Sequence, residues 1–131
     1  MSSNWDEEVL ARTLYGEARG ERREGIEAVA AVMMNRLKAG RWGKRAASVC
    51  LARKQFSCWD DGNRERMAAV DSTDAAFVVC QEVALLALTG QLVDPTQGSL
   101  HYHVASLTPY WAHGKTPVCI VGAHAFYNNV A

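Results

Sequence analysis

The chain changes character at Asp94-Pro95, and this change constrains its fold more than any other feature. All three prolines lie at or beyond Pro95, so the longer N-terminal part lacks the residue that most strongly breaks helices. Apolar side chains in that part recur with helical spacing, whereas the segments after Pro95 are rich in Val, Ile, Tyr and His. We therefore expect an α+β fold, mainly helical, with a small extended or β C-terminal part.

Helical periodicity is clearest in two segments near the N-terminus. The segment 5–18 carries one apolar face, which includes Leu10 and Leu14. A second helix is predicted over 24–38, with Gly40 as its stop. The stretch 40–63 looks irregular, apart from a short helix expected near 46–51.

A third long helix is predicted to begin at Asp71 or Ser72, either of which can cap its first turn, and to end at Thr89-Gly90. It is apolar on nearly all sides, so we expect it to be the buried central helix. The segments 100–105 and 118–127 read as short strands or extended loops, with turns at Gly114 and Gly122.

Length and charge limit the classes of partner. The chain has 131 residues, which fits a single domain over 1–131, and its 14 basic side chains equal its 14 acidic ones. A nucleic-acid-binding domain usually carries a basic excess, so we expect no nucleic-acid partner. The apolar stretch 75–88 is shorter than the ~20 residues that cross a bilayer, so no membrane insertion is expected. The first eight residues lack the basic and apolar regions of a signal peptide.

Glu17 is the most informative single residue. The helical spacing that aligns it with Leu14 turns its carboxylate toward the core or a cleft. Burial raises the pKa of a carboxyl group, as a general acid near neutral pH requires. The alternative is structural, with Glu17 paired to Arg12 or Arg19 or capping a neighbouring helix. Glu21 is expected to interact with the amides that begin the next helix.

Two further clusters carry candidate chemistry. The segment 55–63 combines two aromatic rings with amide and hydroxyl groups, which suits sugar rings, although a turn anchored by core aromatics explains it equally. Strand alternation places His101 and His103 on one face, and His124 lies further along. Three histidines can bind zinc, but the chain lacks a His-Glu-x-x-His helix and any C-x-x-C spacing. We therefore expect no metal and no cofactor.

Several motifs occur in an order that resembles the SleB/CwlJ cell-wall hydrolase family. The first covers Ala11 to Glu21, with the sequence ARTLYGEARGE, and the second covers Val29 to Arg36. Later motifs are found at 55–59, 94–98, 101–103, 109–112 and 122–127. The resemblance extends over about 5–128, which is almost the whole chain.

This resemblance implies a lysozyme-like catalytic domain that cleaves peptidoglycan glycan strands between N-acetylmuramic acid and N-acetylglucosamine. It implies a lytic transglycosylase with Glu17 as catalytic acid/base. The expected substrate-binding residues are Gln55, Ser57, His101, Tyr102, His103, His124 and Tyr127. A second role expected for the histidines is to orient Tyr102 or Glu17. Three alternatives stay open: a muramidase with Asp60 or Asp61 as second carboxylate, a zinc-dependent amidase or peptidase using the three histidines, and a non-catalytic wall-binding module.

Two departures from the spore members point to a different setting. Spore members carry a secretion signal and a separate peptidoglycan-binding repeat, and neither is seen in this sequence. The His101-Tyr102-His103 sequence looks more like the members found in proteobacteria and their phages. We therefore expect a monomeric phage endolysin that acts on the cell wall after a holin opens the inner membrane, with a bacterial autolysin or a component of the phage particle as the alternatives.

Overall fold

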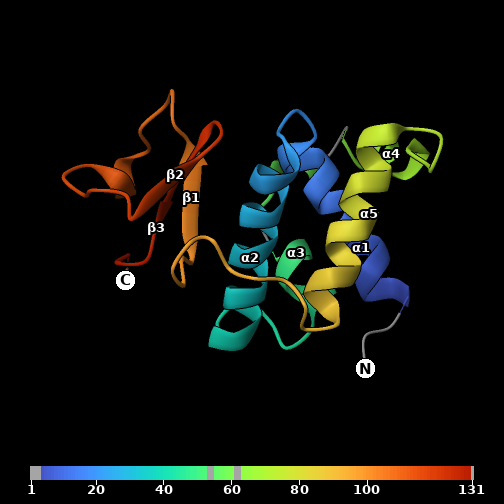
Figure 1. Ribbon diagram of the computed structural model, residues 1–131, viewed down its shortest axis with the longest axis horizontal. Coiled ribbons are helices and arrows are strands. Elements are labelled where there is room, and N and C mark those ends of the chain that lie inside the picture. Colours follow the sequence, from blue (N-terminus) through green and yellow to red (C-terminus); the bar gives the residue numbers. More distant parts are fainter. Residues whose placement is uncertain (1–3, 53–54, 61–62, 131) are drawn as a thin grey trace.

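Helices form the first two thirds of the chain and a small sheet ends it (Figure 1). The computed structural model describes residues 4–52, 55–60 and 63–130. Its α-helices are α1 (Asn4–Ala18), α2 (Arg23–Ala39), α3 (Ala46–Leu51), α4 (Arg64–Ala69) and α5 (Ala75–Leu88). Short 3-10 helices are η1 (Ser57–Trp59) and η2 (Tyr110–Ala112), and the strands are β1 (His101–Val104), β2 (Cys119–Val121) and β3 (His124–Tyr127). The predicted mainly helical α+β fold is confirmed.

The three strands form one antiparallel sheet in the order β1-β3-β2. β3 is the middle strand, with His101 opposite Tyr127 on one side and Cys119 opposite Phe126 on the other. The predicted turn at Gly122 joins β2 to β3, and this glycine has a φ of 57°. Both extended segments predicted after Pro95 are thus strands, as the β-branched and aromatic composition indicated.

The helical core is formed by α1, α2 and α5. Leu10 and Leu14 of α1, Val29 of α2 and Phe77 of α5 are all almost fully buried in it. The apolar faces predicted for the first two helices are therefore confirmed. Gly40 ends α2 in the left-handed conformation, with a φ of 79°, because a residue without Cβ adopts this conformation at little cost.

Two predictions for α5 were wrong. Its N-cap is Asp74, whose side chain accepts hydrogen bonds from the amides of Ala76 and Phe77, whereas Asp71 accepts from Thr73 in the preceding turn. The central helix is α2, which stands between the sheet and α5 (Figure 1). α5 leaves Leu85 half exposed. The apolar composition of α5 indicates that this helix packs against other elements, but it does not show where in the molecule the helix lies.

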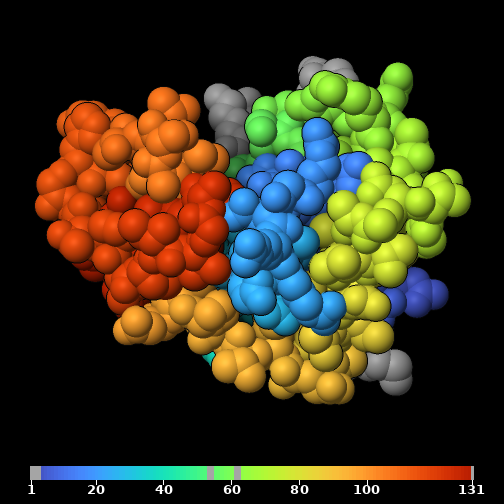
Figure 2. Space-filling view, turned by 45° about the horizontal axis from the view of Figure 1, so that its top comes forward, coloured from blue at the N-terminus to red at the C-terminus, as the bar shows by residue number. Residues whose placement is uncertain are grey.

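The sheet packs against α2 from the side opposite α5 (Figure 1). Phe126 of β3 is fully buried and joins the core of the helices. Figure 2 shows the β2–β3 hairpin directly against the first turns of α2. This packing of the sheet against α2 brings β1 near the end of α1.

No helix in the described part of the chain is long and apolar enough to cross a membrane.

Candidate active site

Glu17 lies in the last turn of α1, where the helix meets the sheet. It opens onto a cavity of about 330 Å³. The cavity is lined by Gly16, Glu17, Arg36, Gln55, Phe56, Ser57, Tyr102, His103, Val104 and His124. These residues come from α1, α2, the loop around η1 and the sheet, so the cavity exists only when both parts of the molecule are assembled.

The Glu17 carboxylate is held by one strong hydrogen bond. The Tyr102 hydroxyl donates to Glu17 Oε1 at 2.7 Å. Burial raises the pKa of Glu17 above its ordinary value, because it removes water from the charged form, and the nearby Asp60 charge acts in the same direction. The Tyr102 hydrogen bond and the Arg36 charge oppose this, but the net shift is upward. A protonated carboxyl at the wall of a cavity can donate a proton to a bound ligand.

Tyr102 is itself held from both sides. Its ring stacks on Phe126 at 5.7 Å and meets the His124 ring edge-to-face at 5.3 Å. Burial, together with the neighbouring Glu17 charge, raises the pKa of Tyr102 well above its ordinary value, so its hydroxyl keeps its proton and remains a donor. Phe126 and His124 thus pack on the ring whose hydroxyl binds Glu17, and the orienting role expected for the histidines stays a prediction.

Arg36 lines the cavity as well, although no sequence motif marked it as a site residue. It is 5% exposed, and its guanidinium donates to the carbonyl of Leu100 at 2.8 Å and to Gln55 Oε1 at 3.0 Å. The same group lies over the rings of Trp42 and Phe56, at 4.7 and 5.5 Å from their centroids. Its place on the buried face of α2, four residues after Val32, was the available signal.

The loop around η1 divides into anchoring and cavity-facing side chains. Phe56 is 4% exposed, and the Trp59 indole donates to Thr13 Oγ1 at 2.8 Å. The two aromatics thus anchor the loop to the core, as the structural alternative predicted. Gln55 and Ser57 remain exposed and line the cavity, as a substrate-binding role requires.

His101 and His103 share one face of β1, as predicted. Both rings contact Trp111, with centroid distances of 5.5 and 5.6 Å. His101 also packs on Trp42, and burial lowers its pKa to about 4, helped by Arg36 and Arg41, so its ring is neutral at pH 7. It does not line the cavity at Glu17.

His103 lines the cavity and also belongs to a second cluster of rings, with Trp111 and Tyr127. Its Nε2 lies 2.8 Å from the Tyr127 hydroxyl, and Tyr127 is buried against Trp111 rather than at the cavity. Among the residues that the structure describes, no three His, Cys, Asp or Glu side chains form a group that could hold a metal ion. The zinc alternative therefore finds no ligand set in the described chain.

The structure corrects the prediction for Glu21. Its Oε1 accepts from the backbone amide of Ala123 at 2.8 Å and lies 3.4 Å from His124 Nδ1. The carboxylate thus binds the β2–β3 turn instead of the first amides of α2. Local sequence could not show this contact, because it joins residues 102 positions apart.

The two carboxylates considered for a muramidase are not placed alike. Asp60 is exposed at the end of η1 and does not line the cavity, although its charge contributes to the raised pKa of Glu17. Asp61 lies outside the described residues. Glu17 is therefore the only carboxylate among the described residues that line the cavity.

Comparison with known proteins places this arrangement in a family. The model of the Cell Wall Hydrolase family matches residues 20–127. The chain belongs to this family. Its relatives include the spore cortex-lytic enzymes of Bacillus subtilis, 33% identical over 95% of this chain and 38% of that protein, and of Halalkalibacterium halodurans, 32% identical over 96% and 36%. The chain thus spans less than half the length of these cell wall hydrolases.

Solved structures of cell wall hydrolases agree with the fold. The catalytic domain of the germination-specific lytic transglycosylase SleB from Bacillus anthracis is 27% identical, with a TM-score of 0.77 over 95% of both chains. The catalytic domain of the Bacillus cereus SleB protein is 25% identical, with the same TM-score, over 97% of this chain and 92% of that one. The expected resemblance to the SleB family is confirmed. These relatives give no support to a phage endolysin released by a holin.

Proposed function

We propose that the chain cleaves peptidoglycan glycan strands between N-acetylmuramic acid and N-acetylglucosamine as a lytic transglycosylase. The observation that carries this proposal is the half-buried Glu17, whose raised pKa and hydrogen bond to Tyr102 suit a general acid at a cavity wall. Membership of the cell wall hydrolase family and the likeness to a solved lytic transglycosylase support it.

The mechanism needs one carboxyl group acting twice. Protonated Glu17 donates its proton to the glycosidic oxygen while an oxocarbenium-like transition state develops on the muramic acid ring. The bond from C1 to the leaving oxygen breaks, and the leaving sugar departs with a new hydroxyl. The Glu17 carboxylate then takes the proton of the C6 hydroxyl, and O6 closes onto C1 to give a 1,6-anhydro end. Glu17 is protonated again, and no water is consumed.

Tyr102 and Arg36 support both steps. The Tyr102 hydroxyl occupies Oε1 of Glu17, which directs the transferable proton to Oε2. The Arg36 charge favours the carboxylate that exists between the two transfers. Gln55 and Ser57 supply amide and hydroxyl groups along the same cavity, and we assign them to the N-acetyl and hydroxyl groups of the sugars.

The products decide between this reaction and hydrolysis. Sacculi digested with the protein and analysed by mass spectrometry are expected to release fragments that end in 1,6-anhydromuramic acid. Reducing muramic ends would instead assign a muramidase, for which Asp60 is the described candidate for the second carboxylate. If the sacculi release only free stem peptides, the proposed reaction is wrong.

The proposal treats the 131 residues as one catalytic domain that acts as a monomer on the cell wall. Delivery by a holin during phage lysis stays a prediction. Sedimentation of the purified chain checks the monomer, and lysis of cells that express it with and without a holin checks the delivery.

A further inference from the structure

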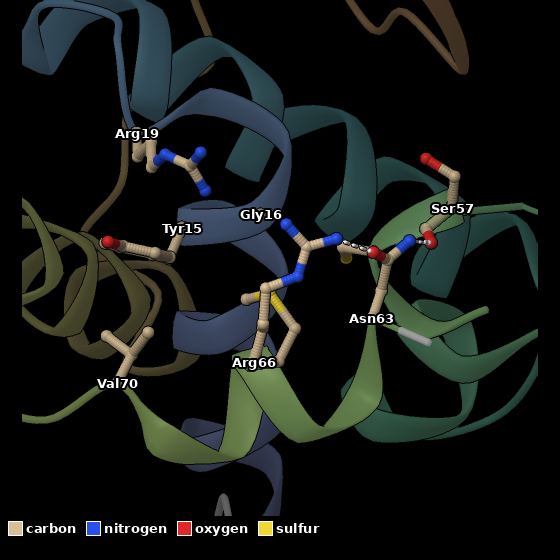
Figure 3. Close-up of a pocket in the computed structure, with 9 residues that line it drawn as sticks. Tyr15, Gly16, Arg19, Ser57, Asn63, Arg66 and Val70 are labelled. Carbon is tan, nitrogen blue, oxygen red and sulfur yellow. Dashed lines mark hydrogen bonds between the residues drawn. The ribbon is translucent and has the colours of Figure 1, made fainter. Parts of the chain in front are cut away.

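Figure 3 shows the residues around a second cavity, of about 490 Å³. It is lined by Tyr15, Gly16, Arg19, Ser57, Cys58, Asn63, Arg66, Met67 and Val70. Gly16 and Ser57 also line the cavity at Glu17, so the two spaces adjoin along these two residues. The proposed mechanism makes no use of this second cavity.

The charged side chains described around this second cavity are all basic. Arg19 and Arg66 contribute two guanidinium groups, and none of the described lining residues is a carboxylate. Arg66 donates to Asn63 Oδ1 at 2.6 Å, a neutral acceptor, and Asn63 in turn donates to the carbonyl of Ser57 at 2.9 Å. Figure 3 shows this chain of hydrogen bonds, which holds the Arg66 side chain across the cavity beside Gly16.

Arg19 stacks on an aromatic ring and forms no salt bridge among the described residues. Its guanidinium lies 5.3 Å from the centroid of the Tyr15 ring. The Tyr15 hydroxyl donates to Asp74 at 2.6 Å, and that carboxylate also accepts from the first amides of α5. The Tyr15 hydrogen bond and, to a smaller extent, the Arg19 charge lower the pKa of Asp74, but within the described chain neither Arg19 nor Arg66 forms a salt bridge. Two exposed guanidinium groups beside one cavity favour an anionic ligand.

The floor of the cavity is apolar. Cys58 and Met67 are buried there, and Val70 is partly buried. Gly16 permits this packing, because a Cβ at this position would collide with the Cys58 side chain. A ligand that fits both features carries small apolar groups together with carboxylates, whereas a neutral sugar uses neither guanidinium group fully.

We propose that this cavity binds the carboxylates of the stem peptide that muramic acid carries, with Arg19 and Arg66 as their partners. The inference rests on the proposed function, because the muramic acid bound at Glu17 would present its peptide next to Gly16 and Ser57. Stem peptides combine alanine methyl groups with free carboxylates, which match the apolar floor and the two guanidinium groups. The cavity thus selects peptide-bearing strands over bare glycan.

Binding measured without turnover tests this separately from catalysis. In a Glu17→Gln background, calorimetry compares a tetrasaccharide of alternating N-acetylglucosamine and N-acetylmuramic acid that carries its peptides with the same sugar after an amidase has removed them and the lactyl carboxylates exposed by this cleavage have been converted to neutral amides. We expect the peptide-bearing form to bind about tenfold more tightly at low salt, with the preference shrinking as salt is added. Arg19→Gln with Arg66→Gln should remove the preference and leave the affinity for the bare sugar unchanged.

The matched control is Arg22→Gln, which removes the same charge from an exposed arginine that does not line the cavity. It should keep the preference. Equal binding of the two sugars by the parent, or a preference that survives loss of both arginines, overturns the inference. Because fragment release by the chain with Glu17 intact is scored separately, failure of the proposed reaction remains distinguishable from failure of the peptide site.

Discussion

Glu17 is expected to be reactive because of its position in the last turn of α1. A carboxylate one turn earlier on the same face would be enclosed in the core, where Leu14 and Thr13 are fully buried, whereas Glu21, one turn later, binds the β2–β3 turn and does not line the cavity. At the helix end Glu17 is half-buried, so burial raises its pKa while one oxygen still reaches the cavity. Its helical spacing gave this position from sequence, but the partner Tyr102 lies 85 residues away and was expected only as a substrate contact.

Replacing Glu17 by Gln removes the proton donor and keeps the shape of the side chain. We expect the release of soluble fragments from sacculi to fall about a thousandfold, since general acid catalysis contributes that much. Circular dichroism and thermal unfolding should match the parent. Glu65→Gln, an exposed carboxylate of α4, is the control and should keep full activity. Full activity of the Glu17 variant would show that another group donates the proton.

Tyr102→Phe tests the hydrogen bond to Glu17 through the pH profile. The bond stabilises the charged form of Glu17, so its loss raises the pKa of Glu17 further. The acid must be protonated to act, so activity falls as pH rises through this pKa, and the alkaline limb of the profile should move to higher pH in the variant. We expect kcat to fall about tenfold, because Glu17 also loses its orientation.

Tyr110→Phe removes the same hydroxyl from a side chain that is 91% exposed, and it should change neither kcat nor the pH profile. A Tyr102→Phe enzyme with lower kcat but an unmoved alkaline limb would mean that Tyr102 supports the fold of the site without acting on the ionisation of Glu17.

The elements that local sequence specifies were predicted closely, and those that depend on distant partners were not. The ends of α2 and α5 followed from Gly40 and Thr89-Gly90, because a left-handed glycine at a helix end, here Gly40 and Gly90, is a local property. The start of α5 could not be predicted from sequence. Asp71, Ser72 and Asp74 are all residue types that cap helices, and local sequence does not distinguish among them. The β2–β3 turn was predicted at Gly122, yet its contact with Glu21 was not.

Gly122→Ala should destabilise the fold for two reasons. Gly122 has a φ of 57°, which costs an L-residue roughly 1 kcal/mol, and an added Cβ would collide with the Glu21 carboxylate. Displacing that carboxylate from the Ala123 amide costs about 1–2 kcal/mol more. Urea unfolding is therefore expected to show a loss of about 2–3 kcal/mol.

Gly114→Ala separates the two causes, because Gly114 has a φ of 77° with open space around its Cα. It should cost only about 1 kcal/mol. In a Glu21→Ala background the cost of Gly122→Ala should fall to the same value. Equal losses at the two glycines in the parent would show that the contact with Glu21 adds nothing.

The proposed site belongs to the whole molecule, because Glu17 comes from the helices and Tyr102 from the sheet. Periodicity predicted each part, but it carries no information on how the parts meet. Besides the buried Phe126, the junction contains a polar contact between distant parts of the sequence, in which Arg36 of α2 donates to the carbonyl of Leu100 just before β1. A buried guanidinium needs such acceptors, so its pairing fixes the distance between α2 and β1.

Arg36→Lys tests whether this junction holds the two parts in register. Lysine keeps the charge but has neither the planar fork that serves Leu100 and Gln55 together nor the flat face over Trp42. We expect the free energy of unfolding to fall by about 2 kcal/mol. Fragment release should fall as well, because Tyr102 moves relative to Glu17.

Arg23→Lys is the matched control on the same helix, since Arg23 pairs with Glu82 at the surface and should change stability by less than about 0.5 kcal/mol. Chemical shifts of the Tyr102 ring report the register directly: they should move in Arg36→Lys and stay fixed in Arg23→Lys. If both variants unfold at the same urea concentration with unmoved Tyr102 signals, apolar packing of Phe126 alone must align the sheet with the helices, and Arg36 serves only the charge of the cavity.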